Sequence, residues 1–325
     1  MRKRRSRHQR KKKGHLATII GILLVFIVVG ISFVVLAKPF DKKLTSLASS
    51  SSRLSSSAKK TGLTASSPSI TASSSTSTSW LNTTAENHLP IMMFHNVSGN
   101  TPNNNYVSPA TLESDFQALQ QNNIYTVSNA EAYKILTTNT KPAEKMIWLT
   151  FDDGYQDFYD SAFPLLKKYK FHATSFVIIS KIGQPGYMTA AELKEMHNSG
   201  YVDIQSHTVS HSDLSVMSDA QQTAELQQSK TYLDQLLGQD TITICYPSGS
   251  HNASTPTISS NLGYKMGLLD PGRTYIGQTA LNAAARASDG LFLLNRYRTF
   301  TNTDGNSMMT TIANDEAYNV SNTVK

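Results

Sequence analysis

The chain has 325 residues, 39% of them hydrophobic, with 30 Lys and Arg against 23 Asp and Glu and a formal net charge of +7. This length is ample for a buried core and allows about one to three domains. A single cysteine, Cys245, excludes an intramolecular disulfide framework, a CxxC redox pair and any zinc site that needs several cysteines.

The positive charge is concentrated at the amino-terminal end. Residues 1–80 hold 15 Lys and Arg and one acid, a net charge of +14, whereas residues 81–325 hold 15 Lys and Arg and 22 Asp and Glu, a net charge of −7. A nucleic-acid-binding domain would carry its positive charge on the folded part. We therefore expect no nucleic-acid partner and, because the glycines form no phosphate-binding loop, no nucleotide.

The chain begins with a basic tail, residues 1–15, which is followed by an apolar segment, residues 16–37. These 22 uncharged residues would span about 33 Å as a helix, enough for a hydrocarbon core of about 30 Å. The heavier cluster of cations before the segment predicts a cytoplasmic N-terminus and an extracellular remainder. We expect an uncleaved, single-pass transmembrane anchor at the cell membrane. A cleavable signal peptide is the alternative, although its apolar region is about 7 to 15 residues long.

Residues 38–80 are predicted to be a disordered linker. From Thr45 to Ser79, 22 of 35 residues are Ser or Thr, and Ile70 is the only β-branched aliphatic residue. Such a composition buries too little apolar surface to offset the entropy lost on ordering. A flexible spacer of this length reaches roughly 33 Å, so it would hold the following domain away from the membrane, where cell-wall polymer lies.

Residues 81–325 are predicted to form one α/β domain. Short apolar runs typical of strands alternate with amphipathic stretches typical of helices. The predicted strands are 90–94, 145–151, 173–180, 201–206, 241–246 and 265–269, and the predicted helices are 109–121, 159–169, 190–198 and 219–237. This alternation indicates a parallel sheet with helical crossovers, either a barrel or an open doubly wound sheet.

Three predicted helices have clear end signals. Ser108 precedes a proline as an N-cap, and Thr189 begins the capping box Thr-Ala-Ala-Glu. Gly238 ends the helix 219–237.

The ends of two predicted strands carry the residues that could do chemistry. The second strand runs into Asp152 and Asp153, and the fourth runs into His207 and His211. Reactive groups of a parallel barrel lie at the carboxyl ends of its strands, and two imidazoles four residues apart on one helical turn can reach one ion. Two histidines and one carboxylate leave open positions on a divalent metal. Neighbouring carboxylates point different ways, so one can bind metal while the other acts as a base.

The segments TFDDG at 150–154 and SHTxxH at 206–211, in this order and spacing, resemble the polysaccharide deacetylase family, the NodB homology domain of carbohydrate esterase family 4. The resemblance implies a distorted (β/α) barrel of about seven parallel strands and metal-dependent removal of acetyl groups from carbohydrate. It also implies that Asp152 is the catalytic base and that Asp153, His207 and His211 bind the metal. Zinc is the expected ion, with cobalt, nickel or manganese as alternatives.

The chain departs from the most familiar members of this family at the general acid. Their acid is a His in a Leu-x-x-His motif near the end of the domain, but no His follows His251 here. Instead, Phe94-His95-Asn96-Val97 resembles the start of extracellular deacetylases that act on poly-N-acetylglucosamine, in which an early His takes the acid role. We expect His95 to be the acid, with a structural His at a strand end as the alternative.

Two later segments also resemble the family. The segment 246–249, Tyr-Pro-Ser-Gly, resembles its third motif, and a backbone N–H near Tyr246 is expected to help hold the oxyanion. The Arg found in that motif in many members is missing. Arg296, in a segment like the family's late Arg segment, could pair with Asp152 in bidentate fashion, or it could be a surface residue. Cys245, in an apolar strand, is expected to be buried packing rather than a nucleophile.

The sequence therefore predicts a membrane-anchored extracellular hydrolase that acts on carbon–nitrogen bonds other than peptide bonds. Its expected reaction is the metal-dependent hydrolysis of N-acetyl groups on a cell-surface amino-sugar polymer, the N-acetylglucosamine of exopolysaccharide or of peptidoglycan. The alternatives are an O-acetyl esterase on wall polysaccharide and a catalytically silent glycan-binding domain. A binding module has no need for a base beside three metal ligands, which argues against the silent domain.

Overall fold

The computed structural model describes residues 79–99, 105–301 and 303–324. The basic tail, the anchor at 16–37 and all but the last two residues of the linker lie outside the described residues, so they remain predictions. None of the helices formed by the described residues has the length and hydrophobicity of a membrane span. All described residues belong to one compact unit, Ser73–Lys325.

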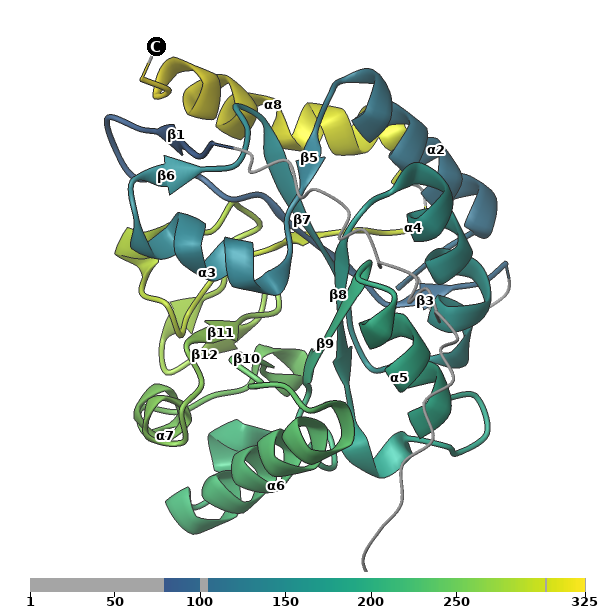
Figure 1. The fold of residues 1–325 in the computed structure, drawn as a ribbon. Coiled ribbons are helices and arrows are strands. Elements are labelled where there is room, and N and C mark those ends of the chain that lie inside the picture. The colour runs from purple at the N-terminus through teal and green to yellow at the C-terminus, as the bar shows by residue number, and fades with distance from the viewer. Residues whose placement is uncertain (1–78, 100–104, 302, 325) are drawn as a thin grey trace, which may run out of the picture. The chain divides into compact units, whose positions relative to one another are not determined.

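The centre of this unit is a curled parallel sheet (Figure 1). Its strands are β2 (Ile91–Phe94), β5 (Tyr125–Thr126), β7 (Met146–Phe151), β8 (Ala173–Val177), β9 (Val202–Ser206), β10 (Thr243–Cys245), β11 (Met266–Leu268) and β14 (Tyr297–Arg298). The order across the sheet is β11-β10-β9-β8-β7-β2-β14, with β5 paired to β7 outside this path. All of these pairings are parallel.

The path of seven strands confirms the predicted α/β class and curls into a half-barrel. The edge strands β11 and β14 form no ladder with each other in the described part of the chain. A single bridge, Leu268 to Leu294, links β11 to the segment just before β14. The family resemblance implies a distorted barrel of about seven strands. The structure has the seven strands, but among the described residues the sheet does not close into a barrel, because its two edge strands do not pair along their length.

Helices and short paired strands surround this sheet. The helices are α2 (Pro109–Gln121), α3 (Asn129–Thr137), α4 (Phe163–Tyr169), α5 (Ala190–Asn198), α6 (Asp219–Leu237), α7 (Thr255–Asn261) and α8 (Gly305–Ser321). Three small sheets pair β1 (Leu81–Asn82) with β6 (Thr140–Lys141), β3 (Asn96–Val97) with β4 (Tyr106–Val107), and β12 (Thr274–Tyr275) with β13 (Gln278–Thr279). The C-terminal helix α8 lies alongside α2 (Figure 1).

The central strands are apolar on both faces because both faces are covered. All six residues of β7 are buried. Ile147, Leu149 and Phe151 belong to one core cluster, whereas Met146 and Trp148, which point the other way, belong to a second. The strand thus separates the core beneath the outer helices from the core inside the curl.

The helices with clear end signals were predicted correctly. The bounds of α2, α5 and α6 agree with the prediction. The Ser108 side chain accepts a hydrogen bond from the Thr111 N–H, Thr189 forms its capping box, and Gly238 ends α6 in a left-handed conformation. Capping depends on residues a few positions apart, so the helix ends predicted from the sequence are found in the structure.

The sequence prediction was wrong in three kinds of places. The helix expected at 159–169 begins with a π-helical turn at Phe158–Ala162, just before Pro164, which has no N–H to donate. The strand expected at 173–180 ends at Val177, because Ile179–Lys181 forms a 3₁₀ turn. Helices α3, α7 and α8 were missed, although α3 begins with a capping box of Ser128 and Glu131.

Candidate active site

The carboxyl ends of the strands meet at one cavity of about 150 Å³. All seven residues predicted for the site line it, namely His95, Asp152, Asp153, His207, His211, Tyr246 and Arg296. They follow or precede five strands of the sheet, β2, β7, β9, β10 and β14. The curl of the sheet therefore gathers residues that are as much as 201 positions apart in the chain.

Asp153, His207 and His211 form a candidate metal-binding set. Their ligand atoms lie within 4.8 Å of one another. The Asp153 Oδ1 atom is 3.3 Å from Nε2 of His207 and 3.4 Å from Nε2 of His211. This oxygen is buried and has no hydrogen-bond partner among the described residues. A buried carboxylate oxygen without a donor, facing two imidazole nitrogens, fits a divalent cation.

One further observation on His207 supports this fit. Its Nδ1 lies 2.7 Å from the Cys245 carbonyl oxygen, which fixes the proton on Nδ1 and leaves the Nε2 lone pair for a ligand role. Burial lowers the pKa of His207, but Cys245 and Asp153 raise it well above its usual value. Burial raises the pKa of Asp153, but the neighbouring His207 has the larger effect and holds the pKa below its usual value. The Asp153 carboxylate is therefore ionised, and a positive charge between it and the two histidines would stabilise it.

The two histidines meet through a loop, and the expected helical turn is absent. Residues 207–211 are not helical, and Thr208 and His211 have left-handed φ angles of 67° and 59°. The backbone N–H groups of Val209 and Ser210 donate to the Glu225 carboxylate at 3.0 and 2.9 Å. A partly buried acid from α6, Glu225, therefore holds the loop in a conformation that costs about 1–3 kcal/mol per strained residue.

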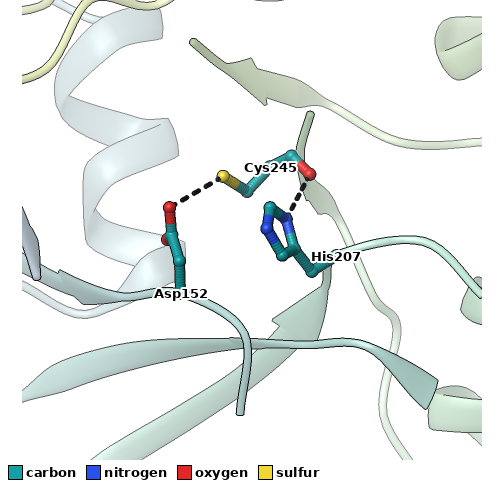
Figure 2. A group of neighbouring side chains, drawn as sticks. All are labelled: Asp152, His207 and Cys245. Atoms are coloured by element: carbon teal, nitrogen blue, oxygen red, sulfur yellow. Dashed lines mark hydrogen bonds between the residues drawn. The ribbon is translucent and has the colours of Figure 1, made fainter. Parts of the chain in front are cut away.

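A second group of possible ligands, Asp152, His207 and Cys245, lies beside the first (Figure 2). Both oxygens of Asp152 already accept hydrogen bonds from Arg296, and Nδ1 of His207 faces the Cys245 carbonyl. Burial raises the pKa of the Cys245 thiol, which keeps it protonated and a poor ligand. These partners leave Asp153, His207 and His211 as the better metal set.

Arg296 forms a bidentate ion pair with Asp152. Its Nη1 and Nη2 atoms donate to Oδ1 and Oδ2 at 2.9 and 2.8 Å, and both side chains are almost completely buried. Burial raises the pKa of Asp152, but the Arg296 guanidinium more than offsets this and holds the pKa far below its usual range. The alternative of a surface arginine is therefore wrong, and Asp152 is ionised.

Cys245 is buried, as predicted, but it also contacts this ion pair. Its Sγ atom lies 3.2 Å from Nη2 of Arg296 and 3.5 Å from Oδ2 of Asp152 (Figure 2). A compact, uncharged thiol at this place fills the space beside the ion pair without adding charge.

His95 follows β2 and lines the same cavity. Burial lowers its pKa, and this outweighs the opposite effect of Asp152 and Asp153. The imidazole is therefore neutral at neutral pH, with a lone pair on one nitrogen and a proton on the other. Such a ring can accept a proton and pass it on.

The environment of Tyr246 differs from the expectation. Its backbone N–H donates to the Leu268 carbonyl at 3.1 Å, so this donor already has a partner in the sheet. Pro247 has no N–H, and the next backbone donor is at Ser248, which lines the cavity with a left-handed φ of 51°. A backbone donor near Tyr246 therefore stays a prediction, and Ser248 rather than Tyr246 is the residue that could supply it.

The sequence analysis missed one wall of the cavity. Asp270, Arg273 and Arg298 line it together with Asn105 and Tyr155. Asp270 follows the predicted strand 265–269, so the strand-end rule that identified the other residues would have found it, whereas Arg298 ends β14, which was not predicted. Arg273, Asn105 and Tyr155 lie in or beside loops and carry no comparable signal.

Known proteins are similar to this chain in sequence and in structure. The profile of the polysaccharide deacetylase family matches residues 139–267. YxkH of Bacillus subtilis, assigned as a polysaccharide deacetylase, is 35% identical over 223 residues, 68% of this chain and 75% of YxkH. A poly-β-1,6-N-acetyl-D-glucosamine N-deacetylase of Staphylococcus aureus is 31% identical over 137 residues, 38% of this chain and 47% of that protein. The structure of Streptococcus pyogenes deacetylase PplD in complex with acetate has a TM-score of 0.64 and 36% identity, covering 70% of this chain and 99% of PplD.

Proposed function

The chain belongs to the polysaccharide deacetylase family, and we propose that it hydrolyses the N-acetyl groups of an N-acetylglucosamine polymer with the help of a divalent metal ion. The observation that carries this proposal is the pair of carboxylates after β7. Asp152 is held ionised by Arg296, while the free oxygen of Asp153 faces His207 and His211. One carboxylate is thus arranged as a base and its neighbour as a ligand.

Asp153, His207 and His211 would hold the ion, which when bound supplies Lewis acidity to the acetyl carbonyl and to the attacking water. Asp152 accepts the proton of that water as its oxygen attacks the carbonyl carbon. Arg296 fixes the orientation of Asp152 through two hydrogen bonds and through a third from its Nε to the Leu269 carbonyl at 2.8 Å.

The carbon–nitrogen bond then breaks, and the nitrogen must gain a proton to leave as an amine. His95 is the candidate donor, because it lines the cavity and its neutral ring can take up the proton that Asp152 removed from the water and deliver it to the nitrogen. The Ser248 backbone N–H is a candidate for stabilising the negative oxygen of the carbonyl, because Ser248 lines the cavity. The products are acetate and a glycan with a free amine.

A relative and the N-terminal sequence support the identity of the polymer and its location outside the membrane. A relative from Staphylococcus aureus is named for deacetylation of poly-β-1,6-N-acetyl-D-glucosamine, and the early position of His95 is similar to that class. The apolar segment 16–37 and the linker 38–80 support a domain tethered outside the cell membrane. Membrane fractionation of cells expressing the full chain, with and without residues 16–37, tests the tether.

The decisive experiment is acetate release by the full-length protein with added Zn²⁺. The substrates are β-1,6- and β-1,4-linked N-acetylglucosamine oligomers and peptidoglycan fragments, and free amine is measured beside acetate. We expect both products in equal amounts from at least one substrate. Acetate without amine, from O-acetylated glycan only, would indicate an esterase, and glycan binding without either product would indicate a silent binding domain.

The base is tested by Asp152→Asn. We expect turnover to fall by about 10²-fold or more, with the metal content unchanged. Asp160→Asn is the matched control, because Asp160 is exposed and lies outside the cavity. Turnover by Asp152→Asn at the level of the control would contradict the mechanism.

A further inference from the structure

One part of the cavity wall carries two arginines and one carboxylate that the proposed mechanism does not use, namely Arg273, Arg298 and Asp270. Arg298 stands two residues after Arg296 at the end of β14, so both side chains point to the same face of the strand. The Arg298 guanidinium donates to the Asp270 carboxylate, to the Pro271 carbonyl at 3.3 Å and to Asn105 Oδ1 at 3.4 Å. Arg298 is therefore fixed in place within the cavity wall.

Arg273 is the second arginine of this wall and is much less constrained. Its side chain is 58% exposed, and its Nε lies 3.7 Å from Asp270 Oδ2. No other hydrogen bond or ion pair of its guanidinium is found among the described residues. Arg273 thus presents most of its planar fork to the cavity mouth.

The backbone around Arg273, in contrast, is held by hydrogen bonds and ring contacts. Arg273 precedes the hairpin β12–β13, and its carbonyl accepts the Ala280 N–H at 2.9 Å. The Tyr275 ring of this hairpin packs on His251 at 5.6 Å between centroids, and His251 packs on Tyr246 at 6.1 Å. A ladder of rings therefore connects the base of the hairpin to the cavity wall, while the end of the Arg273 side chain is exposed.

The charges of this wall do not cancel. Asp270 faces Arg273 and Arg298, which leaves a formal charge of +1 on this part of the wall. The charge of Asp152 is balanced by Arg296, and Asp153 faces the two histidines of the metal set. This positive wall lies in a domain, residues 81–325, whose net charge is −7. A guanidinium can donate a hydrogen bond to a neutral sugar oxygen, but a carboxylate or a phosphate oxygen pair matches its fork and its charge, which makes the bond stronger.

We propose that Arg273 and Arg298 form a subsite for an anionic substituent, a carboxylate or a phosphate, on the glycan next to the acetylated sugar. This inference rests on the proposed function and narrows its substrate to acidic N-acetylated polymers. Arg298 supplies a fixed charge, and Arg273 closes on the anion from the hairpin. A free amine produced by the reaction is repelled by the same wall, which favours product release.

Three oligosaccharides of equal length test this subsite on the full-length protein with Zn²⁺. One is a neutral N-acetylglucosamine tetramer, the second carries the lactyl carboxylates of N-acetylmuramic acid, and the third carries a phosphate on a neighbouring hydroxyl. At low salt we expect kcat/KM to be about tenfold higher for at least one of the acidic substrates. Comparing the second with the third identifies the anion. Raising the salt from about 0.05 to 0.5 M should shrink the preference, because Arg273 is exposed to screening.

The variant Arg273→Gln should raise KM for the preferred acidic substrate by about five- to tenfold, with kcat and the neutral substrate unchanged. The matched control is Arg286→Gln, since Arg286 is also partly exposed, pairs with one acid, Asp289, and does not line the cavity. Arg298→Lys keeps the positive charge but loses the planar fork. Its KM for the preferred acidic substrate should lie between the values of wild type and Arg273→Gln.

The two levels of the hypothesis fail differently. If no glycan releases acetate, the proposed function is wrong. If neutral and acidic glycans are hydrolysed with equal kcat/KM, or if Arg273→Gln and Arg286→Gln behave alike, the enzyme is confirmed and the anionic subsite is rejected.

Discussion

The Asp152–Arg296 ion pair shows how one contact serves both stability and reactivity. An isolated buried carboxylate would take up a proton and lose its function as a base. Here the planar guanidinium matches both carboxylate oxygens at 2.9 and 2.8 Å, and Arg296 is further held by the Leu269 carbonyl. Charge and orientation therefore come from the same residue.

The variant Arg296→Lys separates these two contributions. An ammonium keeps the positive charge but cannot donate two parallel hydrogen bonds, so Asp152 should remain ionised while its orientation loosens. We expect kcat to fall by about tenfold or more with little change in KM, measured by acetate release. Arg286→Lys, which changes a partly exposed arginine paired with Asp289, is the control.

If Arg296→Lys and wild type have equal kcat, the positive charge of residue 296 is sufficient for Asp152 to act as the base, and the two parallel hydrogen bonds are not needed. If Arg296→Lys does not fold, Arg296→Gln combined with Asp152→Asn replaces the ion pair by a neutral hydrogen-bonded pair. That double variant should fold and be inactive.

At the scale of single elements, the loop after β10 illustrates a position where a left-handed backbone and a lack of space for a Cβ atom together favour glycine. Gly249 has a φ of +69°, and a Cβ atom built on it would lie 2.7 Å from the Asp270 backbone nitrogen. Gly272 has a similar φ of +79°, but no atom lies within 4 Å of its Cβ position. The two glycines thus share the strained conformation and differ in the available space.

We predict that Gly249→Ala destabilises the protein more than Gly272→Ala does. The left-handed conformation costs a non-glycine residue about 1–2 kcal/mol, and displacing Asp270 costs about 1–3 kcal/mol more. Chemical denaturation of the two full-length variants measures the difference. Equal losses of unfolding free energy would show that Asp270 moves freely, and the subsite on its side chain would then lack a fixed wall.

The packing of α2 against α8 contains a buried carboxyl group that makes stability depend on pH. Asp115 is fully buried, and neither carboxylate oxygen has a hydrogen-bond partner among the described residues. Burial, with a smaller effect of Asp304 at the start of α8, raises its pKa from 3.8 to about 8. The folded protein therefore holds a proton between about pH 4 and pH 8 that the unfolded chain releases.

This raised pKa sets the sign of the pH effect. The stabilising contribution is complete below about pH 4 and is lost as the pH rises toward 8, by at most about 1.4 kcal/mol per pH unit. Asp115→Asn removes the ionisation, so the variant should be more stable than wild type near pH 9 and similar near pH 4. Thermal unfolding followed by tryptophan fluorescence measures both.

The exposed residue Asp219 provides the control for Asp115. Asp219→Asn should leave the pH dependence of unfolding unchanged. If Asp115→Asn has the same pH dependence as wild type, the carboxyl group has partners that keep it ionised in the folded state.

At the scale of the whole molecule, the metal set ties together segments that are distant in the chain. Asp153 follows β7, whereas His207 and His211 follow β9, and β8 lies between these strands in the sheet. An ion bound to all three residues binds the folded state and not the dispersed ligands of the unfolded chain. Metal binding should therefore stabilise the entire domain.

We predict that Zn²⁺ at about 100 times its Kd adds about 2.7 kcal/mol to the unfolding free energy, which raises Tm by several degrees, and that a chelator reverses the effect. Asp153→Asn should lose most of this shift, whereas Asp160→Asn should retain it. A shift of equal size in Asp153→Asn would place the ion elsewhere. Thermal unfolding with and without metal measures each case without reference to activity.

The sequence by itself determined the local features. Caps and periodicity defined α2, α5 and α6, and the strand-end residues Asp152 and Asp153 were identified as a pair with different tasks. These signals depend on residues a few positions apart, so they are readable without the fold. Helices α7 and α8 were missed because their polar sequences give weak periodicity, and packing against the domain decides their structure.

Only the tertiary structure decided which distant residues meet. Arg296 reaches Asp152 across 144 residues because β14 pairs with β2, which in turn pairs with β7. The same curl brings Arg298 and Asp270 together in the lining of the cavity, although β14, which Arg298 ends, was not predicted from the sequence. Strand order results from long-range packing of the whole sheet, so no local pattern of residues specifies it.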